Sequence, residues 1–217
     1  MVNRTALLVR GGWEGHFPVE ATDRYAAELR ARDYQVTVSD TVDSYLDAEL
    51  LNETDLIVQC WTMGTITREQ LAGLSSAVRA GAGFAGRHGG IIDSFRSEPE
   101  YHLITGGQFV HHPKGFVDYT VRAASPVPHP LVAGLGEFKV QTEQYYVHVD
   151  PSVRVHAVTE SVDDPARQPR VGEGAPRRLG VQLERGGLVH PAAVGEGGAD
   201  DGDPAEARRA VRDGGVQ

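Results

Sequence analysis

The feature that most constrains the fold is a glycine-rich turn over residues 81–90, Gly-Ala-Gly-Phe-Ala-Gly-Arg-His-Gly-Gly. A short apolar run ends there in Gly-x-His-x-Gly, and a new segment follows. Small residues let a chain turn sharply out of a strand while one side chain stays exposed above the sheet, which is the pattern of a nucleophile elbow. The tip residue is His88, where a hydrolase carries serine or cysteine. A histidine there can move protons or bind a metal; the simpler interpretation is a turn with a solvated histidine.

Composition limits the partners and the compartment. The chain has 217 residues and a formal net charge of -9, which fits one domain with a real core and argues against nucleic-acid or anionic-membrane partners. Its one cysteine, Cys60, gives no intramolecular disulfide and fits a reducing compartment. The sequence has neither the roughly 20-residue apolar run of a membrane span nor the apolar segment of a signal peptide. We therefore expect a soluble cytoplasmic protein.

Strand-like and helix-like segments alternate in the first half of the chain. Apolar runs predict buried strands, helical spacing predicts the segments between them, and Thr67-x-x-Gln70 adds a capping box. The predicted strands are 6–10, 34–38, 55–60 and 83–86, and the predicted helices are 19–32 and 68–79. Further on, 98–104 has a helical pattern, 116–122 alternates as a strand and 137–149 is mixed.

This alternation predicts an α/β fold with a doubly wound, mainly parallel sheet, extending to about residue 150. The elbow should lie at the carboxyl end of a central strand. Ligands in such sheets bind beyond the carboxyl ends of the strands. Four loops then share one rim: 11–18, the stretch after Ser39, 61–66 and the elbow.

The C-terminal part has a different composition. From Pro151 to Gln217 there is no Phe, Tyr, Trp, Ile or Lys, while Gly, Pro, Arg, Asp and Glu are frequent. Such a segment buries little apolar area, and Arg177-Arg178 stands where a closing strand needs apolar residues. We predict a single α/β domain over 1–158 and a poorly ordered remnant of its C-terminal part over 159–217. The sheet edge left uncovered would favour a homo-oligomer.

Five motifs, in order, resemble the ThuA-like (trehalose-utilisation) family. They are Gly11-Gly12-Trp13-x-Gly15-His16-x-Pro18, Gly86-x-His88-Gly89-Gly90-x-x-Asp93-Ser94-Phe95, Gly106-Gly107-x-Phe109-x-x-His112-Pro113, His129-Pro130-Leu131-Val132-x-Gly134-Leu135 and Thr142-Glu143-x-Tyr145-Tyr146. The resemblance implies a flavodoxin-like, class I glutamine amidotransferase-like fold and a role in carbohydrate metabolism.

The resemblance does not imply glutamine hydrolysis, because that family has histidine where the amidotransferases carry their cysteine. Two departures stand out. Arg87 occupies a position that is usually aromatic or aliphatic, and the tail lacks a recognisable closing strand.

The candidate catalytic residues are few, and each has a structural alternative. His88 and Glu143 are the acid–base candidates, although Glu143 also fits a solvated strand position. Asp93 either orients His88 or caps the next segment. Cys60 fits a buried small hydrophobe better than a nucleophile. The candidate substrate-binding residues, which also fit loop or sheet-covering positions, are Trp13, His16, Trp61, His112 and Tyr145.

The remaining histidines give weaker signals. His111 and His112 are adjacent, so in an extended chain they point to opposite faces and at most one faces a pocket. The family register favours His112. His102 and His129 fit structural or solvated positions.

Three functions remain open. The first is acid–base chemistry on a small-molecule carbohydrate or keto-sugar, as an isomerase, lyase or hydrolase. The second is binding of a divalent metal such as zinc by His16, His88 and His112, although no His-x-x-x-His spacing supports it. The third is a non-catalytic sugar-binding protein or an inactive paralogue. For the first, we expect His16, His88, His112 and Glu143 to converge on one cleft.

Overall fold

The computed structural model describes residues 4–112, 115–124, 132–160, 178–180 and 183–184. Their contacts form two compact units that divide between Ile104 and Thr105, a division that the sequence did not indicate. Most of the predicted tail, 159–217, lies outside the described residues, as does His129. The predicted domain boundary at residue 158 and the poor order of the tail therefore stay predictions.

The first unit contains the predicted parallel sheet. Its four strands are hydrogen-bonded in the order β2-β1-β3-β4, and every pairing is parallel. This is the start of the flavodoxin-like order 2-1-3-4-5. The strands are β1 (Arg4–Gly12), β2 (Tyr34–Ser39), β3 (Leu56–Thr62) and β4 (Gly83–Gly86).

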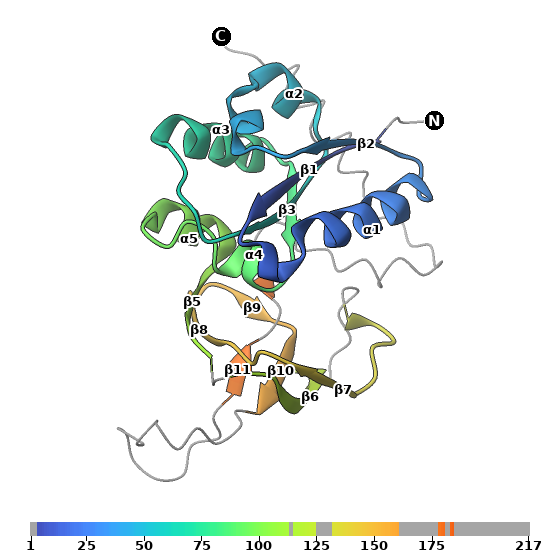
Figure 1. Ribbon diagram of the computed structural model, residues 1–217, viewed down its shortest axis with the longest axis vertical. Helices are drawn as coiled ribbons and strands as arrows, with labels where there is room; N and C mark the ends of the chain where they lie inside the picture. Colours follow the sequence, from blue (N-terminus) through green and yellow to red (C-terminus); the bar gives the residue numbers. More distant parts are fainter. Residues whose placement is uncertain (1–3, 113–114, 125–131, 161–177, 181–182, 185–217) are drawn as a thin grey trace. The chain divides into compact units, whose positions relative to one another are not determined.

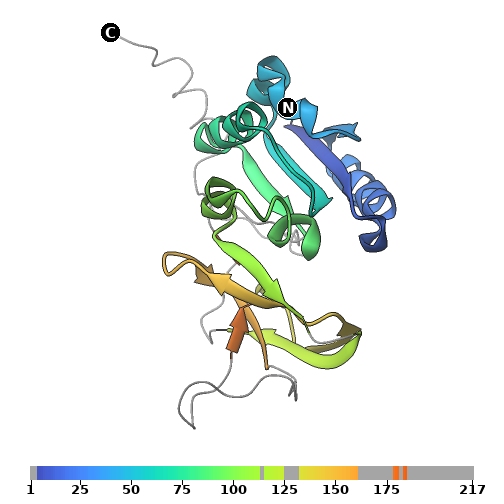
Figure 2. The ribbon, with the colours of Figure 1, turned by 60° about the vertical axis from the view of Figure 1, so that its left-hand side comes forward.

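Helices lie on both faces of this sheet (Figures 1 and 2). They are η1 (Glu14–His16), α1 (Pro18–Arg30), η2 (Val42–Leu46), α2 (Ala48–Glu53), α3 (Arg68–Arg79), α4 (Gly89–Ile92) and α5 (Pro99–Thr105). The predicted capping box is present at the start of α3, where Thr67 and Gln70 bond each other's backbone N–H groups. Among the described residues, no helix has the length and apolar character needed to cross a membrane.

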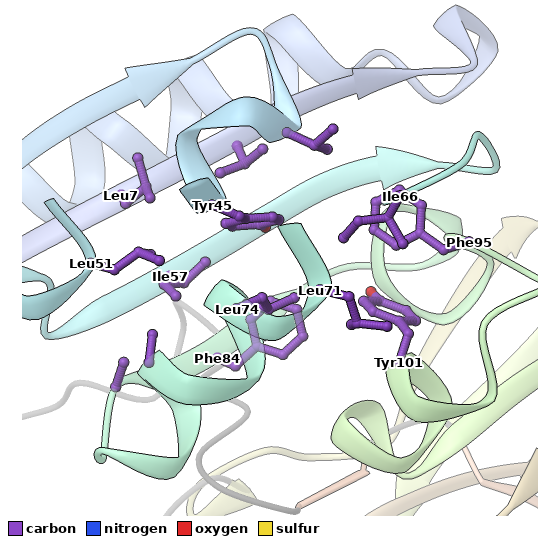
Figure 3. Close-up of a cluster of buried hydrophobic side chains, with 14 of the residues drawn as sticks. Leu7, Tyr45, Leu51, Ile57, Ile66, Leu71, Leu74, Phe84, Phe95 and Tyr101 are labelled. Atoms are coloured by element: carbon purple, nitrogen blue, oxygen red, sulfur yellow. The ribbon is translucent and has the colours of Figure 1, made fainter. Parts of the chain in front are cut away.

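Alternation along β1 explains the doubly wound arrangement. Leu7 and Val9 point into a core that α2, α3, α5 and η2 cover, while Ala6 and Leu8 point into a second core under α1. The first core is the larger and contains four buried aromatic rings. Figure 3 shows these rings among leucine and isoleucine side chains; they belong to Tyr45, Phe84, Phe95 and Tyr101.

A buried polar network lies within the larger core. The Gln59 side chain, on β3, is fully buried. Its amide oxygen accepts the Tyr45 hydroxyl at 2.8 Å, and its amide nitrogen donates to the Tyr101 hydroxyl at 2.6 Å and to Ser94 Oγ at 3.0 Å. Burial raises the pKa of Tyr45 and of Tyr101, so both phenols stay protonated. One side chain therefore connects β3 to η2, to α5 and to the segment after α4.

The second unit is antiparallel throughout its described strands. Its pairings form a four-stranded sheet, β11-β10-β6-β7, and two ribbons, β5-β8 and β12-β9. The strands are β5 (Gly107–His111), β6 (Val117–Ala123), β7 (Phe138–Thr142), β8 (Tyr146–Val149), β9 (Arg154–Val155), β10 (Ala157–Glu160), β11 (Arg178–Gly180) and β12 (Leu183–Glu184).

The α/β class and the individual segments of the first unit are confirmed, and one expectation is corrected. Helix 68–79 and strand 83–86 have the predicted bounds, and the other predicted segments of this unit differ by a few residues. Parallel pairing does not continue to residue 150, because the strands after Gly107 pair antiparallel.

We predict that Gln59→Leu lowers the free energy of unfolding by about 2–3 kcal/mol, because buried hydroxyls lose their partner. The Tyr45 hydroxyl bonds only to Gln59 among the described residues. Adding Tyr45→Phe to Gln59→Leu should therefore cost little more, whereas Tyr45→Phe alone should be clearly destabilising. Urea unfolding of the three variants measures the coupling. Gln35→Leu, on the exposed face of β2, is the matched control, and additive losses would contradict the network.

Candidate functional site

The glycine-rich turn forms the predicted elbow. β4 ends at Gly86, α4 begins at Gly89, and His88 between them has φ 49° and ψ -138°. A non-glycine residue in this region of backbone space is strained, and such strain concentrates at functional sites. The expectation that the elbow follows a central strand is wrong. Among the described residues, β4 is the outermost strand of the sheet.

Close backbone contacts explain why glycines flank the histidine. A Cβ at Gly86 would lie 2.6 Å from the carbonyl oxygen of Gln59 and 2.7 Å from Cβ of Ile91. A Cβ at Gly90 would lie 3.0 Å from Cα of Cys60. The elbow therefore packs directly on the backbone of β3, and no larger residue fits at Gly86 without a shift.

The loop after β1 brings a second histidine to the elbow. His16 ends η1, and its ring lies edge-on to the His88 ring with 5.0 Å between centroids. His16 Nδ1 is 2.8 Å from Thr62 Oγ1 at the carboxyl end of β3. The Arg87 guanidinium donates to the His16 carbonyl at 2.8 Å. Three of the four predicted rim loops thus meet around two imidazoles.

A hollow of about 210 Å³, counting the part open to solvent, lies at this meeting point. Its lining residues are His16, Pro18, Cys60, Thr62, Arg87, His88 and Gly90. Burial raises the pKa of the Cys60 thiol to about 11, against a smaller lowering by the charge of Arg87. The thiol is therefore protonated at neutral pH, which agrees with the interpretation of Cys60 as a small buried hydrophobe.

The two tryptophans have different environments. Trp13 is 47% exposed, and its ring lies edge-on to His16 with 4.7 Å between centroids. Trp61 packs against the larger core, and its ring approaches Gly11 so closely that a Cβ there would lie 2.5 Å from it. Trp13 has the exposure that stacking on a sugar requires, whereas Trp61 fits the alternative of covering the end of the sheet.

Asp93 is buried at the end of α4. Arg96 donates to both of its carboxylate oxygens, at 2.5 and 2.8 Å. This ion pair, rather than a contact with His88, holds the carboxylate. The position of Asp93 therefore favours the structural interpretation over orientation of the elbow histidine.

The second unit brings three of the other candidates together. Glu143 Oε1 lies 3.6 Å from His112 Nε2, and the Tyr145 hydroxyl donates to Glu143 Oε2 at 3.4 Å. The rings of His112 and Tyr145 are stacked, with 5.9 Å between centroids. Only 15% of the Glu143 side chain is exposed. The His16–His88 pair and this cluster each form within one unit; their convergence on a single cleft stays a prediction.

The expectation that the adjacent histidines point to opposite faces is wrong, whereas the expectation that at most one of them faces a pocket stays a prediction. The rings of His111 and His112 do not point to opposite faces but are stacked, with 6.0 Å between centroids and 15° between planes. The register of β5 shifts between Phe109 and His111, and the strand ends at His111. This irregularity breaks the alternation on which the expectation depended.

The sequence analysis did not single out Thr62, which lines the hollow, or Gln59, which belongs to the buried polar network. Thr62 is the partner of His16, and its signal was a polar residue at the carboxyl end of an apolar strand. Gln59 had a comparable signal, as a polar residue inside that strand. His102, which we expected to be structural or solvated, is half-buried on α5 and contacts the Arg96 carbonyl at 3.3 Å.

The parallel sheet and the elbow define a flavodoxin-like α/β protein with histidine at the tip. The family model ThuA, described as trehalose utilisation, matches residues 5–198. This chain belongs to the ThuA family. A search of curated proteins finds no match.

Solved structures show the same fold at low sequence identity. A ThuA-like protein from Bacteroides uniformis ATCC 8492 has a TM-score of 0.64 and 17% identity, with 82% of this chain and 76% of that chain covered. A ThuA-like protein from Parabacteroides merdae ATCC 43184 has a TM-score of 0.59 and 16% identity, with 74% and 70% covered. A cytoplasmic protein from Salmonella typhimurium LT2 has a TM-score of 0.50 and 14% identity, with 72% and 82% covered.

We predict that Cys60 is inert toward thiol reagents in the folded protein. With a pKa of about 11, the thiolate fraction at neutral pH is about 100-fold below that of an ordinary thiol. Because the chain has a single cysteine, colour release from a disulfide reagent reports on Cys60 alone. Reaction should be slow in the native protein and fast in urea. Equal rates in the two states would show an exposed, activated thiol.

Proposed function

We propose that this protein acts on a carbohydrate by proton transfer, with His88 as the group that accepts or donates the proton. The observation that carries the proposal is the strained position of His88, held at φ 49° and ψ -138° beside a hollow. Such strain costs on the order of 1–3 kcal/mol and persists where the surrounding structure over-determines it. The trehalose-utilisation family supports a sugar as the substrate class.

The surroundings of His88 support acid–base chemistry over covalent catalysis. The Cys60 thiol in the lining is protonated, because burial raises its pKa to about 11. The lining also includes the Thr62 hydroxyl, which is bonded to His16. The two imidazoles therefore supply the chemistry in this hollow. Imidazole titrates near neutral pH and can serve as acid or base.

Glu143 is the proposed second acid–base group. Its carboxylate is mostly buried and lies beside His112 and Tyr145, so its position is restrained by two polar neighbours. A histidine and a carboxylate that act on one sugar suit isomerisation next to a carbonyl, elimination or hydrolysis. The proposal includes the convergence of the His16–His88 pair with this cluster.

A metal-binding function has one observation in its favour. The His16 and His88 rings are 5.0 Å apart between centroids, close enough for both to bind one ion. Zinc sites need three or four protein ligands, so His112 or another group must complete the set. Metal analysis of the purified protein tests this alternative: a stoichiometric ion lost in both His16→Ala and His88→Ala would favour it over acid–base chemistry without a metal.

We predict that His88→Ala abolishes product formation from the sugar that proves to be the substrate in a panel of disaccharides and their keto derivatives. The free energy of unfolding should change by less than about 1 kcal/mol, because the backbone strain remains. His88→Gly should be more stable than His88→Ala by about 1 kcal/mol, because glycine adopts this conformation freely, and equally inactive.

The matched control for this test is His148→Ala, which removes an exposed imidazole from β8. Full activity in the control together with loss in both elbow variants supports a chemical role. A large loss of stability in His88→Ala would show instead that the histidine is structural, and binding of a sugar without turnover would favour a non-catalytic protein.

We predict that Glu143→Gln lowers kcat by about 100-fold or more, as expected for a general acid or base. If His88 and Glu143 act on one substrate, the double variant should be little slower than the slower single variant, because groups acting as a unit are not additive. Steady-state kinetics of a partly active elbow variant, His88→Gln, with and without Glu143→Gln, measures this. Unchanged kcat in Glu143→Gln would place the carboxylate outside the site.

A further inference from the structure

The lining supplied by the first unit carries one permanent positive charge, that of Arg87. That lining contains one guanidinium, two imidazoles, one hydroxyl and a protonated thiol, and the carboxylate of the proposed site, Glu143, belongs to the second unit. The whole chain has 30 acidic residues against 21 basic ones. The permanent charge in this part of the lining is therefore positive, although the chain as a whole is acidic.

Arg87 supplies the permanent charge in this lining. One of its terminal nitrogens donates to the His16 carbonyl at 2.8 Å, and among the described residues its side chain has no acidic partner. Four arginines form ion pairs with aspartate or glutamate, namely Arg10, Arg32, Arg96 and Arg122. Arg87 is exposed and, in the described part of the chain, shares the lack of such a pair with Arg30. The carbonyl contact holds one N–H of the guanidinium beside the hollow and leaves most of its N–H donors for a ligand.

We propose that the ligand of this site is an anionic sugar, carrying a carboxylate or a phosphate, and that Arg87 selects for the anion. The inference deepens the proposed function and rests on it for the sugar. Guanidinium groups bind carboxylate and phosphate oxygens through paired, charge-assisted hydrogen bonds. The neighbouring Cys60 stays neutral and does not repel an anion.

Calorimetric titration with four probes tests the proposal: glucose, glucuronate, glucose phosphorylated at its primary hydroxyl, and inorganic phosphate. We expect at least one of the two charged sugars to bind about tenfold or more tightly than glucose. Preference for glucuronate identifies a carboxylate, and preference for the phosphorylated sugar identifies a phosphate. Equal affinity for charged and neutral sugars would overturn the inference.

Two substitutions separate the charge of Arg87 from its contact with His16. Arg87→Gln can still donate to the His16 carbonyl but has no charge, so it should lose the preference for the anion. Arg87→Lys keeps the charge and should retain part of the preference. Arg30→Gln is the matched control, because it removes an exposed charge at the far end of α1. An unchanged preference in Arg87→Gln would overturn the assignment of Arg87.

The outcomes also distinguish this inference from the proposed function. Binding of inorganic phosphate that depends on Arg87, with no binding of any sugar, would support the anion site and refute the carbohydrate substrate. Turnover of a neutral sugar that depends on His88, with no preference for charged sugars, would support the proposed function and refute the anion site. If no probe binds, the inference fails.

Discussion

The side-chain amide of Gln59 is buried in β3 and joins three parts of the first unit through Tyr45, Tyr101 and Ser94. Ser94 Oγ in turn donates to the Trp61 carbonyl at 2.5 Å, and the Tyr101 hydroxyl donates to the Ile91 carbonyl at 2.8 Å. These bonds hold the segment after the elbow against β3. A side chain at Gly86 would meet the backbone carbonyl oxygen of the same Gln59. The elbow packs so closely on β3 that only glycine fits at its base.

The strain at His88 is tolerated because its surroundings leave the elbow no room to relax. On one side Gly86 and Gly90 pack on the backbone of β3, and on the other Arg87 bonds the His16 carbonyl. Each bond of the Gln59 network contributes on the order of 1 kcal/mol net, which together offset a backbone cost of 1–3 kcal/mol. The restrained backbone limits where the His88 imidazole can lie, and a restrained proton donor or acceptor loses less entropy when it is positioned during a reaction.

The sequence predicted the elements whose signals are local. Apolar runs located β1, β3 and β4, the Thr67–Gln70 pair located the start of α3, and the glycines located the elbow. Loops at the carboxyl ends of parallel strands share one rim, and this rule correctly predicted that His16 lies close to His88. What the sequence could not supply depends on contacts between distant segments: the partners of Gln59, the Arg96 ion pair of Asp93 and the bulge that stacks His111 on His112. No local pattern specifies which polar groups meet once strands have packed.

The negative net charge of the chain and the positive charge of Arg87 act over different distances. At physiological salt, charges farther apart than about 8 Å are largely screened, so the net charge of -9 has little influence on a ligand already in contact with Arg87. At longer range the same net charge slows the approach of an anion rather than steering it. An anionic ligand would therefore owe its affinity to short-range bonds from Arg87 and the two histidines, and this affinity would depend on salt less than that of a protein that attracts anions by its overall charge.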